Sequence, residues 1–358
     1  MRWSRVLTAV GTHSGGEYAR VVTGGVVDVP GRTMFDKRTH LQDHADHYRR
    51  RLLFEPLGGV LHAADIVLPS NHPEAQLGYV ILESSGYAVM SGSNTISVAT
   101  VILETGMVEM VEPETLLVLE SPGGLVRLRC RCSGGKVTSV ELENQPSFVF
   151  ALDEVLDVPG FGSVRVDVAW GGMVYLVVRA DDLGFAMTED EAGALAAAGQ
   201  AITRAAEGRI DVRHPLHPEY PPITQTVITG AVTRRDDGVL HARNAVAVPP
   251  GRLDRSACGT GTSARLAVMH ARGEIAEGET LVHESVLGSQ YEARIVAVGS
   301  EGGLPSVTCT IAGQAWITDI AQIGLDPTDP FPAGYTLSDT WGDVPPPRFP
   351  LSPAARIL

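Results

Sequence analysis

Two related stretches of sequence, far apart in the chain, most constrain how it can fold. The stretch Asp254–Ala264 reads DRSACGTGTSA and leads into apolar positions with the i, i+3, i+4, i+7 spacing of a packed helix. This pattern puts Cys258 at the N-terminus of the predicted helix. Backbone N–H groups and the positive end of the helix dipole converge there, so the position favours an anion, either a substrate carboxylate or the cysteine thiolate itself.

A diverged copy of this unit lies in the first half of the chain. Ser91-Gly92 corresponds to Cys258-Gly259, and an apolar helical pattern follows both dipeptides. Gly106 follows the first dipeptide at the same interval as Gly273 follows the second. The chain therefore reads as two copies of one unit. If the two copies face each other, both helix N-termini point at a single ligand between them.

The length of the chain agrees with this duplication, because 358 residues suffice for two domains with their own cores. We expect residues 1–147 to form an N-terminal half around the Ser91 helix and residues 148–324 a C-terminal half around the Cys258 helix. The Pro-rich C-terminal segment, about 325–358, could pack back onto the first half. Residues 34–53 have a helical and highly charged pattern, which predicts one helix there.

The charge of the chain limits its partners. Twenty-eight basic and 42 acidic residues give a net charge of −14, which argues against nucleic acid or an anionic membrane surface. No apolar run approaches the ~20 residues of a transmembrane helix, and the N-terminal hydrophobic stretch is too short for a signal peptide. We therefore expect a cytoplasmic protein that acts on a small molecule.

Metal binding is a weak hypothesis for this chain. Three histidines in the charged 34–53 segment, His40, His44 and His47, have metal-compatible helical spacing. A solvated helix face explains them better, because that segment is polar nearly all round. The pair Cys130–Cys132 lacks a second half-site, so buried free cysteines are expected there. We predict no metal site.

Cofactor chemistries also fit poorly. The only lysines, Lys37 and Lys136, have neither a glycine-rich nor an apolar setting for a pyridoxal-phosphate Schiff base. The glycines within 259–264 lack the preceding apolar strand of a dinucleotide-binding fold, and no Gly-Lys-Ser/Thr is present for a P-loop. A glycine turn at Thr12–Glu17 places His13 and Glu17 between two predicted strands, where site residues often lie, although by itself this segment is better explained as a hairpin with exposed polar residues.

A thiol at one helix start and a hydroxyl at the other remain as the candidate chemistry. No sequence-local base accompanies Cys258, so a thiol hydrolase is disfavoured. A group poised this way can remove or deliver a proton at a carbon next to a carboxylate, whose developing negative charge the converging N–H donors stabilise.

The two signatures, MSGSNTI at 90–96 and DRSACGTGTSA at 254–264, resemble those of the proline racemase superfamily, which includes 4-hydroxyproline 2-epimerases and trans-3-hydroxy-L-proline dehydratases. Supporting segments occur through nearly the whole chain, at 12–17, 55–59, 144–148, 170–172, 182–184, 243–245, 284–285 and 329–331. The resemblance implies a diaminopimelate-epimerase-like α/β fold with two pseudo-symmetric halves, each a curved sheet or barrel around a central helix. It also implies a substrate in the cleft between the halves and no cofactor.

The signatures depart from the family at two positions. Racemases and epimerases of the family carry cysteine at both helix starts, whereas this chain has Ser91 at the first, and Ser93 replaces the usual histidine. A serine hydroxyl is a far weaker acid than a thiol of pKa ~8.5, which compromises proton exchange between two faces. Dehydration of trans-3-hydroxy-L-proline needs a competent base on one face only, because the hydroxyl and the Cα hydrogen lie on the same face of the ring.

The Ser/Cys pairing therefore predicts a dehydratase that gives Δ1-pyrroline-2-carboxylate. A 4-hydroxyproline 2-epimerase is the alternative, and a non-catalytic amino-acid-binding protein is a second one. Whether Ser91 or Cys258 takes the proton stays open: acidity favours the thiol, while other dehydratases of the superfamily are thought to use the first position. A homodimer is compatible with either activity.

The remaining site residues follow from the resemblance position by position. Asp254 would accept hydrogen bonds from the ring nitrogen of the substrate, although a helix-capping aspartate is an equally good explanation of this residue. The substrate carboxylate would be held by the backbone amides of Gly92, Ser93, Gly259 and Thr260. The Ser93 side chain would contact the substrate hydroxyl or serve as a passive polar contact.

Overall fold

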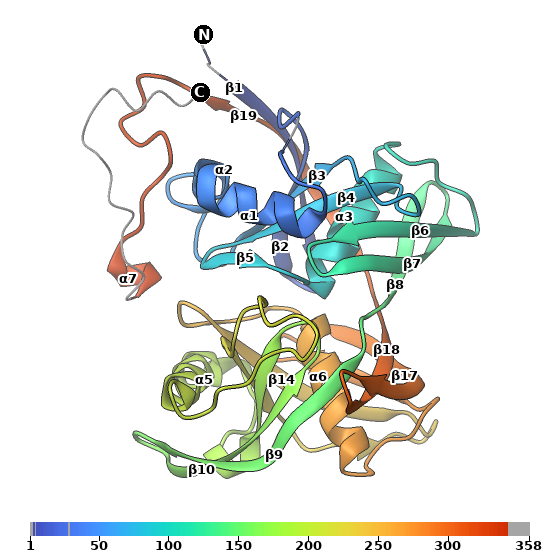
Figure 1. Cartoon of the computed structure of the whole chain (residues 1–358), viewed down its shortest axis with the longest axis vertical. Helices are drawn as coiled ribbons and strands as arrows, with labels where there is room; N and C mark the ends of the chain where they lie inside the picture. Colours follow the sequence, from blue (N-terminus) through green and yellow to red (C-terminus); the bar gives the residue numbers. More distant parts are fainter. Residues whose placement is uncertain (1–2, 4, 28, 343–358) are drawn as a thin grey trace.

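The computed structural model describes residues 3, 5–27 and 29–342, which form two α/β halves built on the same plan (Figure 1). Its helices are α1 (Met34–His44), α2 (His47–Leu53), α3 (Gly92–Glu104), α4 (Ala180–Leu183), α5 (Ala192–Ala206), α6 (Gly259–Ala271) and α7 (Ser338–Trp341), with a 3-10 turn at Glu189–Glu191. The strands before the middle of the chain are β1 (Arg5–Ser14), β2 (Glu17–Gly24), β3 (Ala63–Leu68), β4 (Leu77–Glu83), β5 (Gly86–Ala88), β6 (Glu114–Ser121), β7 (Gly124–Ser133) and β8 (Lys136–Glu143). Those after it are β9 (Ser147–Val158), β10 (Gly162–Trp170), β11 (Val174–Arg179), β12 (Gln225–Thr229), β13 (Thr233–Arg234), β14 (Leu240–Val248), β15 (Arg252–Leu253), β16 (Thr280–Ser285), β17 (Gln290–Glu301), β18 (Leu304–Gly313) and β19 (Ala315–Leu325).

The C-terminal half is a closed barrel around α6. Within the described residues, eight strands pair in the order β9, β10, β11, β12, β14, β16, β17 and β18, and β18 pairs with β9 to close the ring. Two of these pairings, β11 with β12 and β14 with β16, are parallel, and the chain between each pair contains a helix, α5 or α6. Because parallel neighbours need such a crossover, α6 is carried into the barrel by its own connection.

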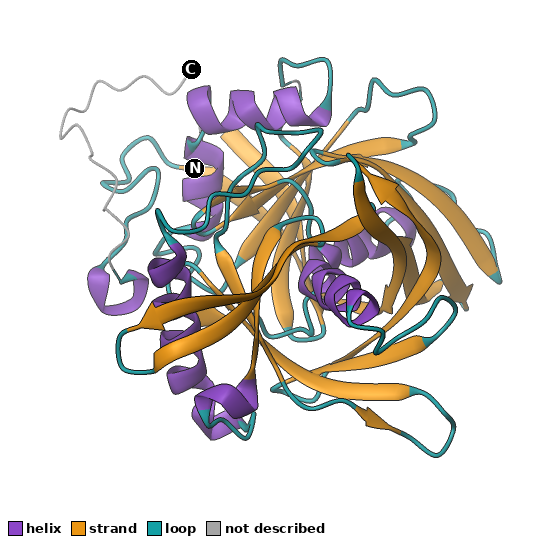
Figure 2. Ribbon diagram, turned by 60° about the horizontal axis from the view of Figure 1, so that its bottom comes forward, coloured by secondary structure: helices purple, strands orange, loops and turns teal. Residues whose placement is uncertain are grey.

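The N-terminal half wraps around α3 in a similar way. Its strands pair in the order β19, β1, β2, β3, β4, β6, β7 and β8. β8 then pairs with the end of β18, which continues into β19, so the two halves share one continuous sheet. Figure 2 shows the two central helices enclosed by curved strands.

The two central helices are buried on all sides rather than on one face. Every residue of α3 from Gly92 to Leu103 is buried, and so is every residue of α6 from Gly259 to Met269. A helix without charged side chains over most of its length can occupy such a position, because water reaches none of its faces. The sequence pattern predicted a one-faced helix in each half, and the enclosure of the remaining faces comes from the closing strands.

The N-termini of α3 and α6 meet backbone to backbone. A Cβ atom placed on Gly92 would lie 3.0 Å from the Cα of Gly259, and a Cβ placed on Gly259 would lie 3.0 Å from the Cα of Gly92. This contact explains why glycine follows the candidate residue in both copies of the unit: only a residue without a side chain allows the two helix ends to approach so closely.

Two expectations about the organisation of the chain need correction. Residues 315–324 were assigned to the C-terminal half, but β19 pairs along its length with β1 and belongs to the sheet around α3. Residues 34–53 form two helices instead of one, because the chain leaves the helical path at Ala45–Asp46 between α1 and α2.

The C-terminal segment packs on the N-terminal half as far as it is described. Tyr335 forms a two-way backbone bridge with Glu55, and the Trp341 indole nitrogen donates to the Glu55 carboxylate at 3.0 Å. The Trp341 ring also lies edge-on against Phe54. The last part of that expectation, residues 343–358, lies outside the described residues.

No helix in residues 3, 5–27 and 29–342 combines the length and the apolar character that crossing a bilayer requires.

Candidate active site

Ser91 and Cys258 line one cavity where the two helix N-termini meet. The cavity has walls from both halves of the protein and is polar, as expected for a site that orients a small charged ligand. Besides these two residues, its polar side chains are Glu17, Glu83, Ser85, Ser93, Asn94, Tyr175, Gln225, Arg252, Asp254 and Thr260. The remaining lining residues include Ala63, Ala88, Met90 and Met173.

Cys258 has a strained backbone that its neighbours hold in place. Its φ of +58° and ψ of 109° lie in a region that residues with a Cβ atom rarely adopt. The Asn244 side-chain amide and the Thr262 hydroxyl both donate to the Ala257 carbonyl, at 2.8 and 3.1 Å. The Cys258 amide donates to the Ser256 hydroxyl at 3.2 Å. These bonds fix the peptide group that precedes Cys258, and the Cys258 carbonyl on the other side accepts from the Thr262 amide at 2.9 Å. Held in this way, the Cys258 thiol lines the cavity.

The thiol of Cys258 is buried and protonated in this state. Burial raises the pKa of the Cys258 thiol well above its usual range, and the Asp254 carboxylate raises it further. Three hydrogen bonds to the Cys258 sulfur act in the other direction and lower its pKa. They come from the Tyr175 hydroxyl at 3.5 Å, the Gly261 N–H at 3.4 Å and the Thr260 hydroxyl at 3.7 Å. A positive charge near Asp254 would offset its field and make the thiolate easier to form.

Ser91 occupies the matching position at α3 without the strain. Its φ of −151° and ψ of 123° are ordinary extended values. Its hydroxyl lies 3.4 Å from the Ser93 hydroxyl, and its carbonyl accepts from the Thr95 amide and hydroxyl. The duplicated unit is therefore symmetric in its helices but not in the backbone of its two chemically important residues.

The first turns of both helices offer unpaired backbone donors. The amides of Gly92, Ser93, Gly259 and Thr260 precede the first intrahelical bonds and take no other partner among the described residues. Because two helix N-termini converge there, a carboxylate would meet N–H groups and partial positive charge from both sides.

A buried arginine and three carboxylates line the wall of the cavity. Arg252 is 8% exposed and forms ion pairs with Glu17 at 3.3 Å, Asp254 at 3.3 Å and Glu83 at 3.4 Å. Glu17 also accepts from the Arg255 amide at 2.6 Å. One guanidinium facing three carboxylates leaves this wall with excess negative charge, which favours a cationic group on a ligand.

Burial and the excess negative charge raise the pKa of two of these carboxyl groups. Burial raises the pKa of Asp254 to about 7, with Glu17 adding to the shift and Arg252 opposing it. Burial likewise raises the pKa of Glu83 to about 7 against the effect of Arg252. Near neutral pH the wall therefore carries a proton that a cationic ligand can displace.

These shifts predict how the protein's stability depends on pH. Glu83 ionises near 4.5 when unfolded and near 7 when folded, so its contribution to stability is present below about 4.5 and is lost as pH rises through 7. Glu83→Gln removes this titration. The free energy of unfolding of the wild type should therefore fall, relative to that of the variant, by on the order of 2 kcal/mol as the pH rises from 5 to 8. Urea unfolding at both pH values measures the difference, and a constant offset would contradict the prediction.

The cavity brings together most of the residues that the sequence singled out. Ser91, Ser93, Asp254, Cys258 and Thr260 all line it. Gly92 and Gly259 supply the helix contact and their amides instead of lining side chains.

The two candidate residues of the glycine turn near the start of the chain lie at different sites. Glu17 reaches the cavity, whereas His13 stacks on Trp316 in a separate surface groove. Sequence reasoning missed Glu83, Tyr175 and Arg252. Arg252 alone had a local signal, because it lies two residues before Asp254 and hence on the same side of an extended segment.

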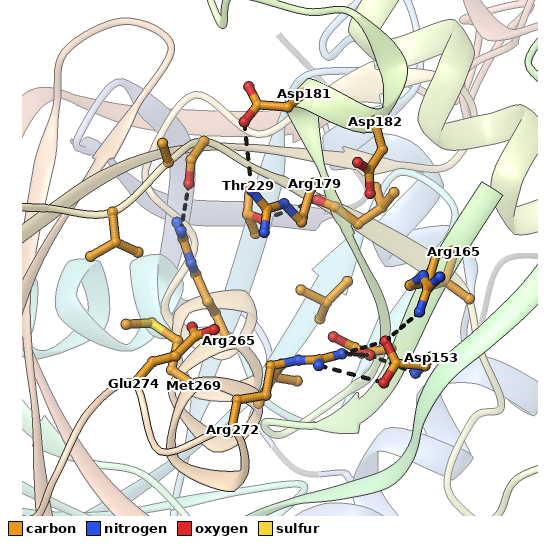
Figure 3. Close-up of a pocket in the computed structure, with 18 residues that line it drawn as sticks. Asp153, Arg165, Arg179, Asp181, Asp182, Thr229, Arg265, Met269, Arg272 and Glu274 are labelled. Carbon is orange, nitrogen blue, oxygen red and sulfur yellow. Dashed lines mark hydrogen bonds and ion pairs between the residues drawn. The ribbon is translucent and has the colours of Figure 1, made fainter.

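A larger cavity of about 590 Å³ lies at the opposite end of α6 (Figure 3). Its charged side chains mostly pair with one another: Arg272 binds Asp153 at 2.9 Å and Asp167 at 2.7 Å, and Arg165 binds Asp153 at 3.3 Å. Neither Ser91 nor Cys258 lines it, so its size does not make it the better candidate.

Comparison with known proteins gives a consistent result. A family model described as proline racemase matches residues 9–336. A hydroxyproline epimerase from Agrobacterium vitis, with bound trans-4-hydroxy-L-proline, is 35% identical with a TM-score of 0.89 over 96% of this chain and 99% of its own. A probable proline racemase from Agrobacterium radiobacter K84, with bound carbonate, is 35% identical with a TM-score of 0.88 over 94% and 98%.

The fold extends to more distant proteins. A predicted epimerase from Pseudomonas aeruginosa shares 16% identity and a TM-score of 0.53 over 89% of this chain and 99% of its own. The expected two-half fold with a central helix in each half is confirmed by these neighbours and by the strand order described above.

Proposed function

Because the chain belongs to the proline racemase family, we propose that it is a cofactor-independent 2-epimerase of a hydroxylated proline. The observation that carries this proposal is the single cavity that holds both Ser91 and Cys258 at converging helix N-termini. The similar epimerase that binds trans-4-hydroxy-L-proline supports the choice of substrate. This reverses the order of the two activities considered from the sequence, where the dehydratase came first.

The charges of the cavity suit a zwitterionic imino acid. The unpaired amides at the starts of α3 and α6 would bind the substrate carboxylate. Asp254, within the negatively charged wall around Arg252, would accept a hydrogen bond from the cationic ring nitrogen. Held at both ends, the substrate would present the two faces of its Cα to opposite walls of the cavity.

The proposed reaction moves one proton off Cα and returns one to the opposite face. The amides at the carboxylate stabilise the negative charge that develops when the Cα–H bond breaks. Cys258 serves one face, since its protonated thiol can donate to the carbanion. In the reverse direction it must act as thiolate, and the substrate cation beside Asp254 offsets the field that disfavours this form. Ser91 serves the other face, with Ser93 as its hydroxyl neighbour. When the Cys258 thiolate takes the Cα proton, the Ser91 hydroxyl donates its proton to the opposite face and regains one from water. In the other direction Ser91 must take the Cα proton as an alkoxide, having first lost its own proton to water.

A second candidate is dehydration of trans-3-hydroxy-L-proline to Δ1-pyrroline-2-carboxylate. The observation that favours it is the serine at position 91, because a hydroxyl is a poor base at neutral pH. Elimination on one face would need only Cys258 or only Ser91 as base, and the same residue could return the proton to the departing hydroxide. We propose this activity only as the alternative to epimerisation.

The variant Ser91→Ala separates the two candidates. For an epimerase, interconversion of trans-4-hydroxy-L-proline and cis-4-hydroxy-D-proline should fall by about 10²–10⁴-fold, because one face of Cα loses its proton carrier. Deuterium exchange from D2O on the Cys258 face should persist, as followed by NMR. Ser91→Cys, which restores a thiol, is the matched control and should epimerise at least as fast as the wild type.

The same incubations identify the alternatives. Pyrroline formation from trans-3-hydroxy-L-proline by the wild type, without epimerisation of the 4-hydroxy isomer, would replace the proposal by the dehydratase. Binding of these imino acids without Cα exchange or conversion would indicate the amino-acid-binding protein.

A further inference from the structure

Two polar side chains on the N-terminal wall of the cavity, and a third behind them, have no part in the proposed proton transfer. Asn94 lies in the first turn of α3, is 1% exposed and lines the cavity. Glu83 lines the same cavity from the end of β4. Asp65 lies behind them on β3 and is fully buried.

The strand register puts the two carboxyl groups on one face of the sheet. Asp65 pairs with Ile81, and Glu83 follows Ile81 by two residues, so Asp65 and Glu83 are diagonal neighbours. Burial, together with Glu83, raises the pKa of Asp65 well above its usual range, which favours the protonated form of this carboxyl, a hydrogen-bond donor. The wall thus carries both hydrogen-bond donors and hydrogen-bond acceptors.

These groups are poorly satisfied within the protein. The Asn94 side chain interacts with the Asp65 carboxyl, but its Nδ2 and both Asp65 oxygens make no hydrogen bond of normal geometry among the described residues. Glu83 uses Oε2 on Arg252 at 3.4 Å, and its Oε1 takes no side-chain or backbone donor within residues 3, 5–27 and 29–342. Buried polar groups without partners call for a ligand or water that completes them.

A hydroxyl is the group that matches this wall, because one oxygen both accepts and donates a hydrogen bond. We propose that Asn94 and Glu83 bind the ring hydroxyl of the substrate, Asn94 donating to the hydroxyl oxygen and Glu83 accepting its hydrogen. Asp65 is a positioning residue that orients Asn94 from behind. This inference rests on the proposed function and adds the residues that select a hydroxylated ring over proline.

The selection has a physical reason. L-proline would place a methylene group against Asn94 and Glu83 and leave both without partners. A site built around a substrate hydroxyl discriminates strongly against the analogue that lacks it, because the unpaired polar groups then oppose binding.

The test compares substrates with and without the hydroxyl. For the wild type, Asn94→Ala and Glu83→Gln, we would measure kcat/KM on trans-4-hydroxy-L-proline and trans-3-hydroxy-L-proline, and the inhibition constant of L-proline, which requires no turnover. Each variant should lower kcat/KM on a hydroxylated substrate by about 10- to 100-fold. For Asn94→Ala the inhibition constant of L-proline should change by less than about threefold. For Glu83→Gln, which also removes charge from the wall that faces the ring nitrogen, it should rise by a smaller factor than kcat/KM on the hydroxylated substrate falls.

Two further variants guard against a folding artefact. Ser97→Ala removes a fully buried α3 hydroxyl that also lacks a partner but does not line the cavity, and it should leave both measurements unchanged. Asn94→Asp keeps the volume of Asn94 and replaces its donor by an acceptor, so it should act in the same direction as Asn94→Ala.

The outcomes separate this inference from the proposed function. If the wild type converts a hydroxyproline but the variants weaken L-proline and hydroxyproline equally, the hydroxyl contact is wrong and the epimerase stands. If the variants leave every value unchanged, the contact is wrong as well. If the wild type neither binds nor converts any imino acid, both proposals fall.

Discussion

Replacing Cys258 by alanine is expected to lower turnover by about 10³-fold or more. The reason is that the thiol is the stronger of the two acids at the opposing helix starts and has no substitute among the residues that line its side of the cavity. Tyr175 and Thr260 lie within reach of the sulfur, but they bond each other at 2.6 Å, and both are hydroxyls. Epimerisation and deuterium exchange at Cα, measured on the same sample, check the prediction.

Two further cysteine variants make the experiment specific. Cys258→Ser keeps a group that can accept the Gly261 N–H and should fold like the wild type, so its activity reports on acidity alone. Cys130→Ala removes another buried thiol, in the core of the N-terminal half and outside the cavity, and should keep wild-type kcat at permissive temperature. Full activity of Cys258→Ala would leave Ser91 as the working residue and overturn the assignment.

The pairing of Ser91 with Cys258 could be predicted from the sequence because it rests on local repetition. Each copy of the unit has a turn, a glycine and an apolar helix at equal intervals, and a duplicated fold must bring equivalent positions to its axis. In the structure the equivalent residues Gly92 and Gly259 do lie against each other. The strain at Cys258 could not be predicted, because it depends on hydrogen bonds from Asn244 and Thr262 to the neighbouring carbonyl.

The charged wall of the cavity was beyond sequence reasoning for a different reason. Glu17 and Glu83 come from β2 and β4 of the N-terminal half and Arg252 from β15 of the C-terminal half, so only the packing of the two halves puts them together. Each residue by itself looks like an exposed polar side chain near a turn. The burial that raises the pKa of Glu83 is likewise a property of the assembled wall and not of the local sequence.

The position of β19 in the fold could not be predicted from the sequence either. Alternation of apolar and polar residues predicts a strand at the end of the chain but not its partner. In the structure this strand pairs with β1 along its length, with one irregularity between Gly11 and Thr12. The N-terminal half is therefore built from β1 to β8 together with β19, and the C-terminal half lies between these two parts of the sequence (Figure 1).

Gly171→Ala is expected to damage both stability and activity, because Gly171 is packed against the backbone of α6. A Cβ atom there would lie 2.2 Å from the Thr260 carbonyl oxygen and 2.4 Å from the Ala264 nitrogen. The atoms that the added Cβ would overlap belong to the backbone and not to a flexible side chain, so the first turn of α6, which carries the unpaired amides and follows Cys258, must shift. We expect a loss of about 3 kcal/mol in the free energy of unfolding.

The matched control is Gly193→Ala on α5, where an added Cβ meets nothing within 4 Å. Alanine is the better helix former, so this variant should gain about 0.5–1 kcal/mol and keep its activity. Urea unfolding and epimerase rates of both variants would be measured together. Because the carboxylate-binding amides move with the helix, Gly171→Ala should lose at least tenfold in kcat/KM even where it is fully folded. A folded Gly171→Ala protein with wild-type rates would show that the first turn of α6 does not need this contact to hold its ligand.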